Sequence, residues 1–166
     1  MTDSEHRSTD VQTRISALLD AAQTPYSVVE HAPAKSAIEA SKYRGTPLQM
    51  GGKTLVMKTD RLGFVILALR GSDTVHNRSL RAHLGLRRYR FATLAELDTL
   101  TGLTPGCIPP FGPPIFDMPL FVDTRLTRQA KIAFTPGRHT QSITLATRDW
   151  LAAARPADIF DFSTPE

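Results

Sequence analysis

The chain has 166 residues, of which 41% are hydrophobic and 22% are charged. This length and this balance are typical of one ordinary globular domain with a core of its own. The single cysteine, Cys107, excludes an internal disulfide framework and a zinc site built from cysteines. The net charge of +4 is compatible with transient contact with a polyanion, although it is too small to demonstrate one.

The first residues are polar, and the longest apolar run, residues 64–69, is much too short to cross a bilayer. We therefore predict a cytoplasmic protein without a signal peptide and without membrane contact. Residues 1–8 are predicted to form a disordered tail, and residues 9–160 are predicted to form a single domain.

Several helices carry recognisable start signals. In a capping box, Ser or Thr is followed three residues later by Glu or Gln. Such pairs are Thr9 with Gln12, Ser36 with Glu39, and Thr93 with Glu96. Together with the apolar spacing, these signals predict helices over 9–23, 36–45, 77–84 and 93–100, and a last helix from residue 147.

Apolar and β-branched runs predict the strands, several of which are joined by tight turns. The run at 64–70 is apolar on both faces, so we expect it in the centre of a sheet. The strands are expected at 26–30, 54–58, 64–70, 120–122, 131–134 and 141–145, with 87–90 as a short strand or connector. This mixture of strands and short helices indicates an α+β fold with a mixed sheet.

Residues 101–119 break the pattern, because proline and glycine recur through them. A loop of this length inside a compact domain is usually functional or disordered. Its apolar residues Ile108, Phe111, Ile115 and Phe116 indicate that it packs against the core.

Lys53 follows a glycine pair and leads into an apolar strand. Residues alternate sides on a strand, so Lys53 shares a face with Leu55 and Met57. If that face is the interior, a cation lies at the edge of the core, where it is costly unless an anion or a strong acceptor meets it. The alternative is that the ammonium group reaches water at the frayed start of the strand.

Several common catalytic motifs are excluded. Gly52-Lys53-Thr54 is not a phosphate-binding loop, because Pro47 stands where that motif needs a glycine and a strand follows where it needs a helix. There is no Gly-x-Ser-x-Gly motif, and the histidines lack metal-binding spacing, so we expect no metal and no cofactor. His31 and His139 lie in loops beside strands, where a structural and a catalytic role are both open.

Arginines gather between residues 78 and 90. They form either a solvated face or a surface for a nucleic-acid backbone, with Tyr89 as a stacking partner.

Four segments, taken in order, carry a family resemblance. They are Gly-Gly-Lys-Thr-Leu-Val-Met-Lys at 51–58, Gly-Ser-Asp at 71–73, Gly-Cys-Ile-Pro-Pro-Phe-Gly at 106–112, and Val-Asp at 122–123 followed by Pro-Gly-Arg-His-Thr at 136–140. Together they resemble the YbaK-type aminoacyl-tRNA deacylases, which are related to the editing domain inserted in bacterial prolyl-tRNA synthetases. The resemblance covers about residues 26–152 and implies a strongly curved mixed β-sheet flanked by helices.

The resemblance implies hydrolysis of the ester between a mischarged amino acid and the terminal adenosine of a tRNA. The family's functional lysine falls on Lys53, and its glycine-rich loop, which lines the amino-acid pocket and helps to place a water, falls on residues 106–112. Members are described as metal-free and as using the ribose hydroxyl of the substrate. Cys107 and Pro109 depart from the usual Gly-Gly-x-Ser-Pro-x-Gly pattern, which bears on the amino acid that the pocket accepts.

We therefore predict a trans-editing aminoacyl-tRNA deacylase whose expected substrate is tRNA for proline carrying alanine or another small amino acid. Misacylated tRNA is the expected partner, and prolyl-tRNA synthetase or an elongation factor are further candidates. One alternative is a non-catalytic tRNA- or synthetase-binding module of the same fold. Another is a hydrolase of a small ester that does not use tRNA.

The resemblance and the arginine cluster together supply the candidate site residues. The expected catalytic residues are Lys53 and Gly106. The substrate-binding candidates are His31, Cys107, Ile108, Pro110, Gly112, Asp123 and His139. The candidates for tRNA contact are Arg78, Arg81, Arg87 and Arg88.

Overall fold

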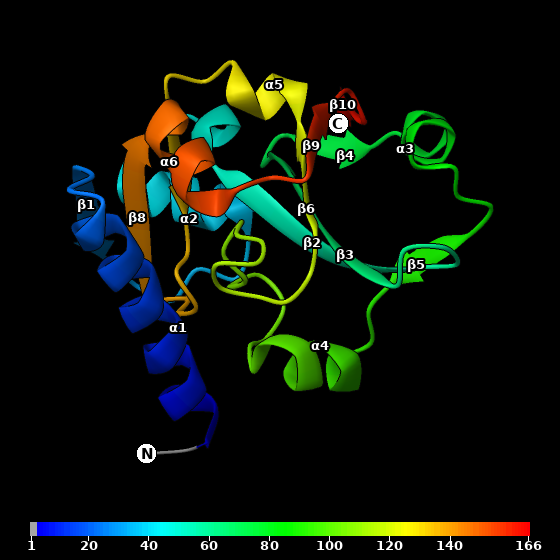
Figure 1. Ribbon diagram of the computed structural model, residues 1–166. Helices are drawn as coiled ribbons and strands as arrows, with labels where there is room; N and C mark the ends of the chain where they lie inside the picture. Colours follow the sequence, from blue (N-terminus) through cyan, green and yellow to red (C-terminus); the bar gives the residue numbers. More distant parts are fainter. Residues whose placement is uncertain (1–2) are drawn as a thin grey trace.

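A five-stranded mixed sheet forms the centre of the molecule (Figure 1). The computed structural model describes residues 3–166, with only the backbone described for residues 3–5. The sheet has the strand order β5-β2-β3-β6-β9. Its strands are β2 (Gly52–Thr59), β3 (Phe64–Arg70), β5 (Tyr89–Phe91), β6 (Leu120–Asp123) and β9 (Asp158–Phe160). The β3–β6 and β6–β9 pairs are parallel and the other pairs are antiparallel.

Two smaller antiparallel sheets complete the β-structure. One has the order β1-β8-β7, and the other pairs β10 with β4. Their strands are β1 (Tyr26–Glu30), β4 (Asp73–Val75), β7 (Lys131–Phe134), β8 (Gln141–Ala146) and β10 (Ser163–Pro165). A single parallel bridge between Gly51 and Ala133 connects the three-stranded sheet to the start of β2. The predicted α+β domain with a mixed sheet is confirmed, but its single curved sheet is divided at this bridge.

Helices flank the sheets, and all but α1 are short. They are α1 (Asp3–Ala21), α2 (Ala37–Arg44), the 3-10 helix η1 (Leu48–Met50), α3 (Asn77–Leu84), α4 (Leu94–Thr101), α5 (Thr124–Thr127) and α6 (Thr147–Ala154). Thr93 and Glu96 form the predicted capping box of α4, and the Ser36 hydroxyl accepts the N–H of Glu39 at the start of α2. No helix in the described part of the chain combines the length and the hydrophobicity needed to cross a membrane.

Both ends of the domain extend beyond the predicted limits. Helix α1 begins at Asp3 and not at Thr9, because residues before Thr9 already pack against the rest of the chain. Ser8 is buried and donates a hydrogen bond to the carbonyl of Gly137. Residues 3–8 are therefore helical and do not form a disordered tail, while residues 1–2 lie outside the described residues. At the other end, Phe162 is fully buried, so the packed chain continues past residue 160.

The five-stranded sheet is covered by apolar side chains on both faces. On one face, Val56 and Ile66 belong to a large cluster that also holds Ile15 of α1 and Trp150 of α6. On the other face, Met57 belongs to a smaller cluster with Phe121, Phe160 and Phe162, and the partly buried Leu55 packs against it. Two predictions are thereby confirmed: β3 is central, and the face that Lys53 shares with Leu55 and Met57 is apolar.

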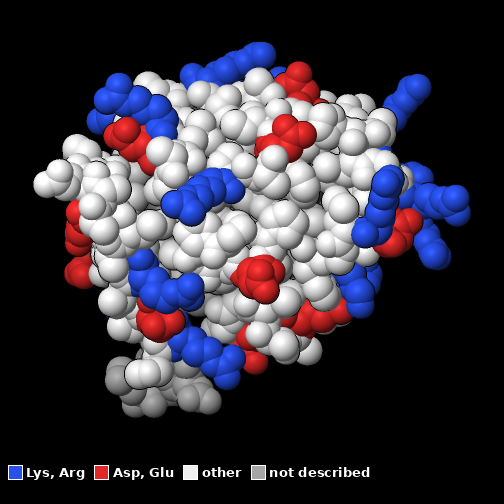
Figure 2. Space-filling model, in the orientation of Figure 1, with Lys and Arg blue, Asp and Glu red and all other residues white. Residues whose placement is uncertain are grey.

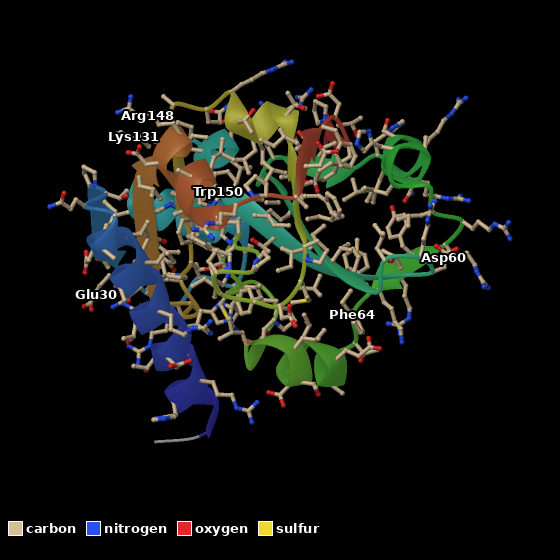
Figure 3. The ribbon with its side chains drawn as sticks, viewed as in Figure 1. Glu30, Asp60, Phe64, Lys131, Arg148 and Trp150 are labelled. Carbon is tan, nitrogen blue, oxygen red and sulfur yellow. The ribbon has the colours of Figure 1, made fainter. Side chains whose placement is uncertain are left out.

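The loop at 101–119 packs as its apolar residues predicted. Ile108, Phe111, Ile115 and Phe116 are all buried. The indole of Trp150, a buried residue of α6 that Figure 3 labels, donates a 2.9 Å hydrogen bond to the carbonyl of Pro110. These contacts fix a long irregular segment against the core, which is the condition for it to line a site.

The cap of α4 yields a first prediction. Hydrogen bonds from the Arg90 guanidinium and from the Thr93 N–H lower the pKa of Glu96 from 4.5 to about 2. Because the pKa of Glu96 is lower in the folded protein than in the unfolded chain, the ionised carboxylate stabilises the fold at pH values above the unfolded pKa. This stabilisation is lost as the pH falls from about 4.5 towards 2. We expect an NMR titration of the Glu96 carboxyl to give a midpoint well below 4.5. The Arg90→Ala variant should move it back upward, and a wild-type midpoint near 4.5 would contradict the prediction.

Candidate functional site

A pocket of about 310 Å³ lies between α2, the start of β2, the 101–119 loop and the end of β7. Its size is at the lower end of the range of about 300–1,000 Å³ that is usual for small-ligand sites. Most of its walls are small or apolar, with Arg44, Lys53 and Thr54 as the polar exceptions on α2 and β2. The full lining is Ala34, Lys35, Ser36, Ala37, Ala40, Arg44, Gly51, Gly52, Lys53, Thr54, Leu55, Gly106, Ile108, Ala133, Phe134 and Thr135.

Three glycines let the pocket form. A Cβ atom on Gly52 would lie 2.9 Å from Cδ1 of Ile132, which no side chain could tolerate without a shift in the wall. A Cβ atom on Gly51 would lie 3.3 Å from Nη2 of Arg44, so this glycine makes room for the guanidinium. Gly106 has a φ of +86°, a conformation that L side chains rarely adopt. Its carbonyl accepts a 3.0 Å hydrogen bond from the Thr135 hydroxyl.

Lys53 lies where this pocket meets a second, larger depression. Its side chain is 26% exposed, and its ammonium group is 3.8 Å from a carboxylate oxygen of Glu166. The environment of Lys53 is therefore intermediate between the two alternatives considered from the sequence, a buried cation and an ammonium group in water. The stem of the lysine adjoins apolar Leu55, while the charge reaches a partly open junction where an anion can approach it.

The larger depression is an open groove of about 1,190 Å³ beside β2, α3 and β5. Basic and aromatic side chains line much of it, and basic groups gather over this edge of the molecule in Figure 2. Phe91 is 64% exposed in it, and Tyr89 is half-buried, which raises the pKa of the Tyr89 hydroxyl despite the opposing charge of Arg81. The charged and aromatic residues of the groove are Lys53, Lys58, Asp60, Arg81, Arg87, Arg88, Tyr89, Arg90, Phe91 and Glu166.

The sequence profile of the aminoacyl-tRNA editing domain matches residues 31–153, a span that includes Lys53, the whole lining of the smaller pocket and the lining of the groove except Glu166. This span is well over half of the chain. The protein belongs to the aminoacyl-tRNA editing domain family. The predicted family is thereby confirmed.

Relatives of this editing domain agree with the match. The chain is 36% identical, over 149 residues, to the multifunctional Ser/Thr-tRNA deacylase ProXp-y of Escherichia coli (strain K12), which covers 86% of this chain and 87% of the relative. A solved structure described as a candidate trans-editing enzyme for prolyl-tRNA synthetase superposes with a TM-score of 0.78 at 21% identity, covering 93% of this chain and 97% of that one. The hypothetical protein APE2540 superposes with a TM-score of 0.79 at 21% identity, covering 91% and 99%. These two structures establish the fold.

Several predicted site residues of the editing domain lie together around the smaller pocket. Gly106 and Ile108 line it with Lys53. His139 lies behind Gly106, and its ring nitrogens make hydrogen bonds of 2.9 Å to the carbonyl of Ala34 and 3.3 Å to the Thr104 hydroxyl. His139 thus supports two parts of the pocket wall without lining it.

Cys107 and Gly112 are buried and face away from the pocket. The Cys107 thiol donates a 3.1 Å hydrogen bond to the carbonyl of Thr104, so the side chain that replaces the usual glycine does not enter the cavity. Gly112 lies against Leu120. A Cβ atom added to Gly112 would lie 3.1 Å from the Cβ atom of Leu120. Pro110 contributes its carbonyl to Trp150. These three residues fix the loop.

Asp123 has a structural set of contacts. It is fully buried, and its two carboxylate oxygens accept the N–H groups of Arg125 at 2.9 Å and of Phe162 at 2.7 Å. It caps α5 and anchors the C-terminal strand, and it lines neither depression.

Three of the four arginines proposed for tRNA contact lie in the groove. Arg81, Arg87 and Arg88 line the groove, whereas Arg78 is exposed on α3 outside it. Within residues 3–166, no group of three or more His, Cys, Asp or Glu side chains could hold a metal ion.

Sequence reasoning missed Arg44, Thr54 and Phe91, and it counted Arg90 in the arginine cluster without naming it as a candidate for tRNA contact. Arg44 carried only the signal of a basic residue in the last turn of a helix, and Thr54 only that of a strand residue. The tertiary fold, and no local pattern, brings these two side chains into one pocket.

Proposed function

We propose that this protein acts as a freestanding deacylase that removes the amino acid from a misacylated tRNA. The observation that carries the proposal is the position of Lys53, between a small pocket and a large basic groove. The pocket suits an aminoacyl group, and the groove suits the negatively charged nucleotides to which that group is attached. The ester bond joining the two parts would then lie at the lysine.

The chemistry needs little more than this arrangement. Water adds to the ester carbonyl, the carbonyl oxygen becomes an oxyanion, and the ribose oxygen leaves with a proton to give free tRNA and a free amino acid. The ammonium group of Lys53 can stabilise the oxyanion or hold an adjacent phosphate oxygen. Because an aminoacyl ester is already reactive, orientation and one well-placed cation are sufficient for a useful rate enhancement.

We propose serine or threonine as the amino acid removed, with alanine as the second candidate. Thr54 lines the pocket, and among the described residues its buried hydroxyl oxygen has no hydrogen-bond partner, so we propose that a substrate hydroxyl pairs with it after a small side-chain movement. The 36% identical relative from Escherichia coli, named a Ser/Thr-tRNA deacylase, supports this choice. The small apolar walls, such as Ala34, Ala37 and Ala40, would also accept alanine.

The proposed substrate implies the cytoplasm as the working compartment. Prolyl-tRNA synthetase is the proposed partner, and the similarity in fold to a candidate trans-editing enzyme for that synthetase is the support for it.

A deacylation assay over seryl-, threonyl-, alanyl-, cysteinyl- and prolyl-tRNA tests the proposal. We expect turnover of at least one misacylated tRNA, with seryl- or threonyl-tRNA the best substrate. Preferred turnover of alanyl-tRNA would favour the second candidate. If every charged tRNA survives at the rate of its spontaneous hydrolysis, the deacylase proposal is wrong and the alternative of a binding module gains support.

The groove yields a separate prediction. Replacing Arg87 and Arg88 by Gln should weaken tRNA binding irrespective of the attached amino acid, because phosphate contacts carry no information about it. The slope of log affinity against log salt should become shallower by about 1.4–1.8, which corresponds to two lost phosphate contacts. Affinity is measured by fluorescence anisotropy from low to moderate salt.

The matched control is Arg148→Gln, since this side chain is 89% exposed on α6 and lies far from the groove in Figure 3. It should leave both the affinity and the salt slope unchanged. Equal effects of the groove and control variants would show that the groove is not the tRNA surface.

A further inference from the structure

Arg44 is a half-buried cation in the wall of the smaller pocket, and no acidic side chain among the described residues pairs with it. Burial lowers the pKa of the Arg44 guanidinium below its usual value, but arginine stays charged in proteins. A partly desolvated charge without a counter-charge is costly, so its presence at this position calls for a ligand.

Neutral groups hold Arg44 in place. Its Nε donates a 3.3 Å hydrogen bond to the Thr46 hydroxyl, and its Nη1 donates a 3.1 Å hydrogen bond to the Ser142 hydroxyl. Its Nη2 lies beside Gly51 and makes no hydrogen bond within the described part of the chain. The guanidinium is thus oriented, while several of its N–H groups remain available to a molecule in the pocket.

A hydrogen bond with His31 orients the Ser142 hydroxyl. Nδ1 of His31 is 2.8 Å from the carbonyl oxygen of Ala32, which requires this nitrogen to donate. In the neutral ring Nε2 is then an acceptor, and it lies 2.8 Å from the Ser142 oxygen. Ser142 therefore donates to His31, and its lone pairs face Arg44. Stacking on Tyr43, with ring centroids 5.7 Å apart, holds the imidazole.

We propose that Arg44 binds an oxygen of the aminoacyl group, either the ester carbonyl oxygen or the hydroxyl of the amino-acid side chain. This inference rests on the proposed deacylation of tRNA. A guanidinium only donates hydrogen bonds, so the group it meets must be an acceptor. The smaller pocket is largely apolar and about a quarter of the volume of the groove, at 310 Å³ against 1,190 Å³, which favours the aminoacyl group over a phosphate.

The charge also selects an orientation. The free amino group of an aminoacyl ester is a cation for much of the time near neutral pH, so it is repelled by Arg44 in the wall and by Lys35 and Lys53, which line the same pocket. The amino acid therefore enters with its oxygen atoms towards Arg44 and its amino group away from it. Thr46, Ser142 and His31 are positioning residues, because they act on the substrate only through the guanidinium.

The test compares Arg44→Gln and Arg44→Lys with the wild type on seryl-tRNA and alanyl-tRNA. The matched control is Lys42→Gln, an exposed cation on the same helix. Loss of a charge-assisted hydrogen bond should lower kcat/KM by about 10- to 100-fold in Arg44→Gln. Arg44→Lys should recover part of this loss, and Lys42→Gln should behave as the wild type. Thermal unfolding checks that each variant is folded.

The two sources of oxygen give different patterns, and both support the proposal. If the ester carbonyl is bound, both substrates lose the same factor, mainly in kcat, because the bond strengthens as the oxyanion forms. If the side-chain hydroxyl is bound, the preference for seryl- over alanyl-tRNA falls. Ser142→Ala should give a weaker version of the same pattern, whichever applies, since it only loosens the guanidinium.

A binding measurement separates this inference from the proposed function. The amide 3′-serylamino-3′-deoxyadenosine keeps both oxygens and resists hydrolysis. Should the wild type hydrolyse no ester yet bind this amide at least tenfold more tightly than Arg44→Gln, the proposed function fails and the role of Arg44 stands. Equal activity and equal amide affinity in Arg44→Gln and the wild type would overturn the inference, and so would a failure of both proteins to bind and hydrolyse.

Discussion

Replacing Lys53 by Ala should lower kcat/KM for the best misacylated tRNA by at least about 100-fold. Removing one group that stabilises a developing oxyanion typically costs about 10²–10³-fold. Lys53 is the charged residue that lines both the pocket and the groove, so its ammonium group lies where the ester is proposed to bind. The loss should appear mainly in kcat if the lysine meets the oxyanion, and mainly in KM if it holds a phosphate.

Single-turnover and steady-state deacylation measure this effect. The matched control is Lys131→Ala, an exposed lysine at the start of β7 that Figure 3 places far from the groove. It should keep the wild-type rate. Lys53→Arg keeps the charge with a different shape, so an intermediate rate is expected. A Lys53→Ala protein that unfolds at the wild-type temperature and retains a third or more of the activity would remove the lysine from the mechanism.

The carboxylate of Glu166 competes with a substrate for the ammonium group of Lys53. Glu166 lies 3.8 Å from the ammonium group, but its own side chain is 63% exposed. Such an exposed pair is weak and is screened by salt. A substrate oxygen can therefore compete with Glu166 for the ammonium group of Lys53.

Elements with strong local signals were predicted closely from the sequence. The limits of β3 and α3 match the expected ranges of residues 64–70 and 77–84, and the predicted capping box opens α4. An apolar run and a cap depend on residues a few positions apart, so the chain itself contains the information. The start of α1 was misplaced because Ser8 is buried by a contact with the distant Gly137.

Contacts between distant segments were not predictable in this way. Strands β4, β9 and β10 have three residues each and carry polar or charged side chains, so they exist only through their pairing partners. The same reason explains the missed Arg44, which reaches Ser142 across 98 positions of sequence. The local pattern drew attention to Lys53, the family resemblance pointed to Gly106 and Ile108, and the rest of the pocket depended on the fold.

Asp73, from the Gly-Ser-Asp segment, illustrates how a family motif can serve the site indirectly. Its side chain is fully buried, and it accepts hydrogen bonds from neighbouring residues and from residues far away in the sequence. Arg70 contacts both of its oxygens, at 2.8 and 3.0 Å, and Nε of Arg125 lies 2.9 Å away. The hydroxyls of Ser72 and Ser163 complete the cluster. Asp73 is the first residue of strand β4, whose next two residues, Thr74 and Val75, line the groove.

Replacing Asp73 by Asn should lower the free energy of unfolding by about 3 kcal/mol or more, because it leaves two arginines without their shared counter-charge. For a chain of this length, that loss corresponds to a fall in Tm of about 6–12 °C. Calorimetry or circular dichroism measures both quantities. Arg125→Gln combined with Asp73→Asn should cost less than the sum of the two single changes, since the partners belong to one network.

The cluster around Asp73 also makes the stability of the fold depend on pH. Burial alone would raise the pKa of Asp73, but the hydrogen bonds from Arg70 and Ser72 and the charge of Arg70 outweigh it and lower the pKa below 3.8. The stabilisation is therefore complete above the unfolded value of about 3.8 and is lost as the pH falls through the folded value. Asp73→Asn should flatten the acid limb of the stability curve. Asp158→Asn, which removes an exposed carboxylate paired with His83, should change Tm little and is the matched control. If both variants unfold at the wild-type temperature, the cluster does not hold the groove wall, and the Gly-Ser-Asp segment needs a direct role at the site.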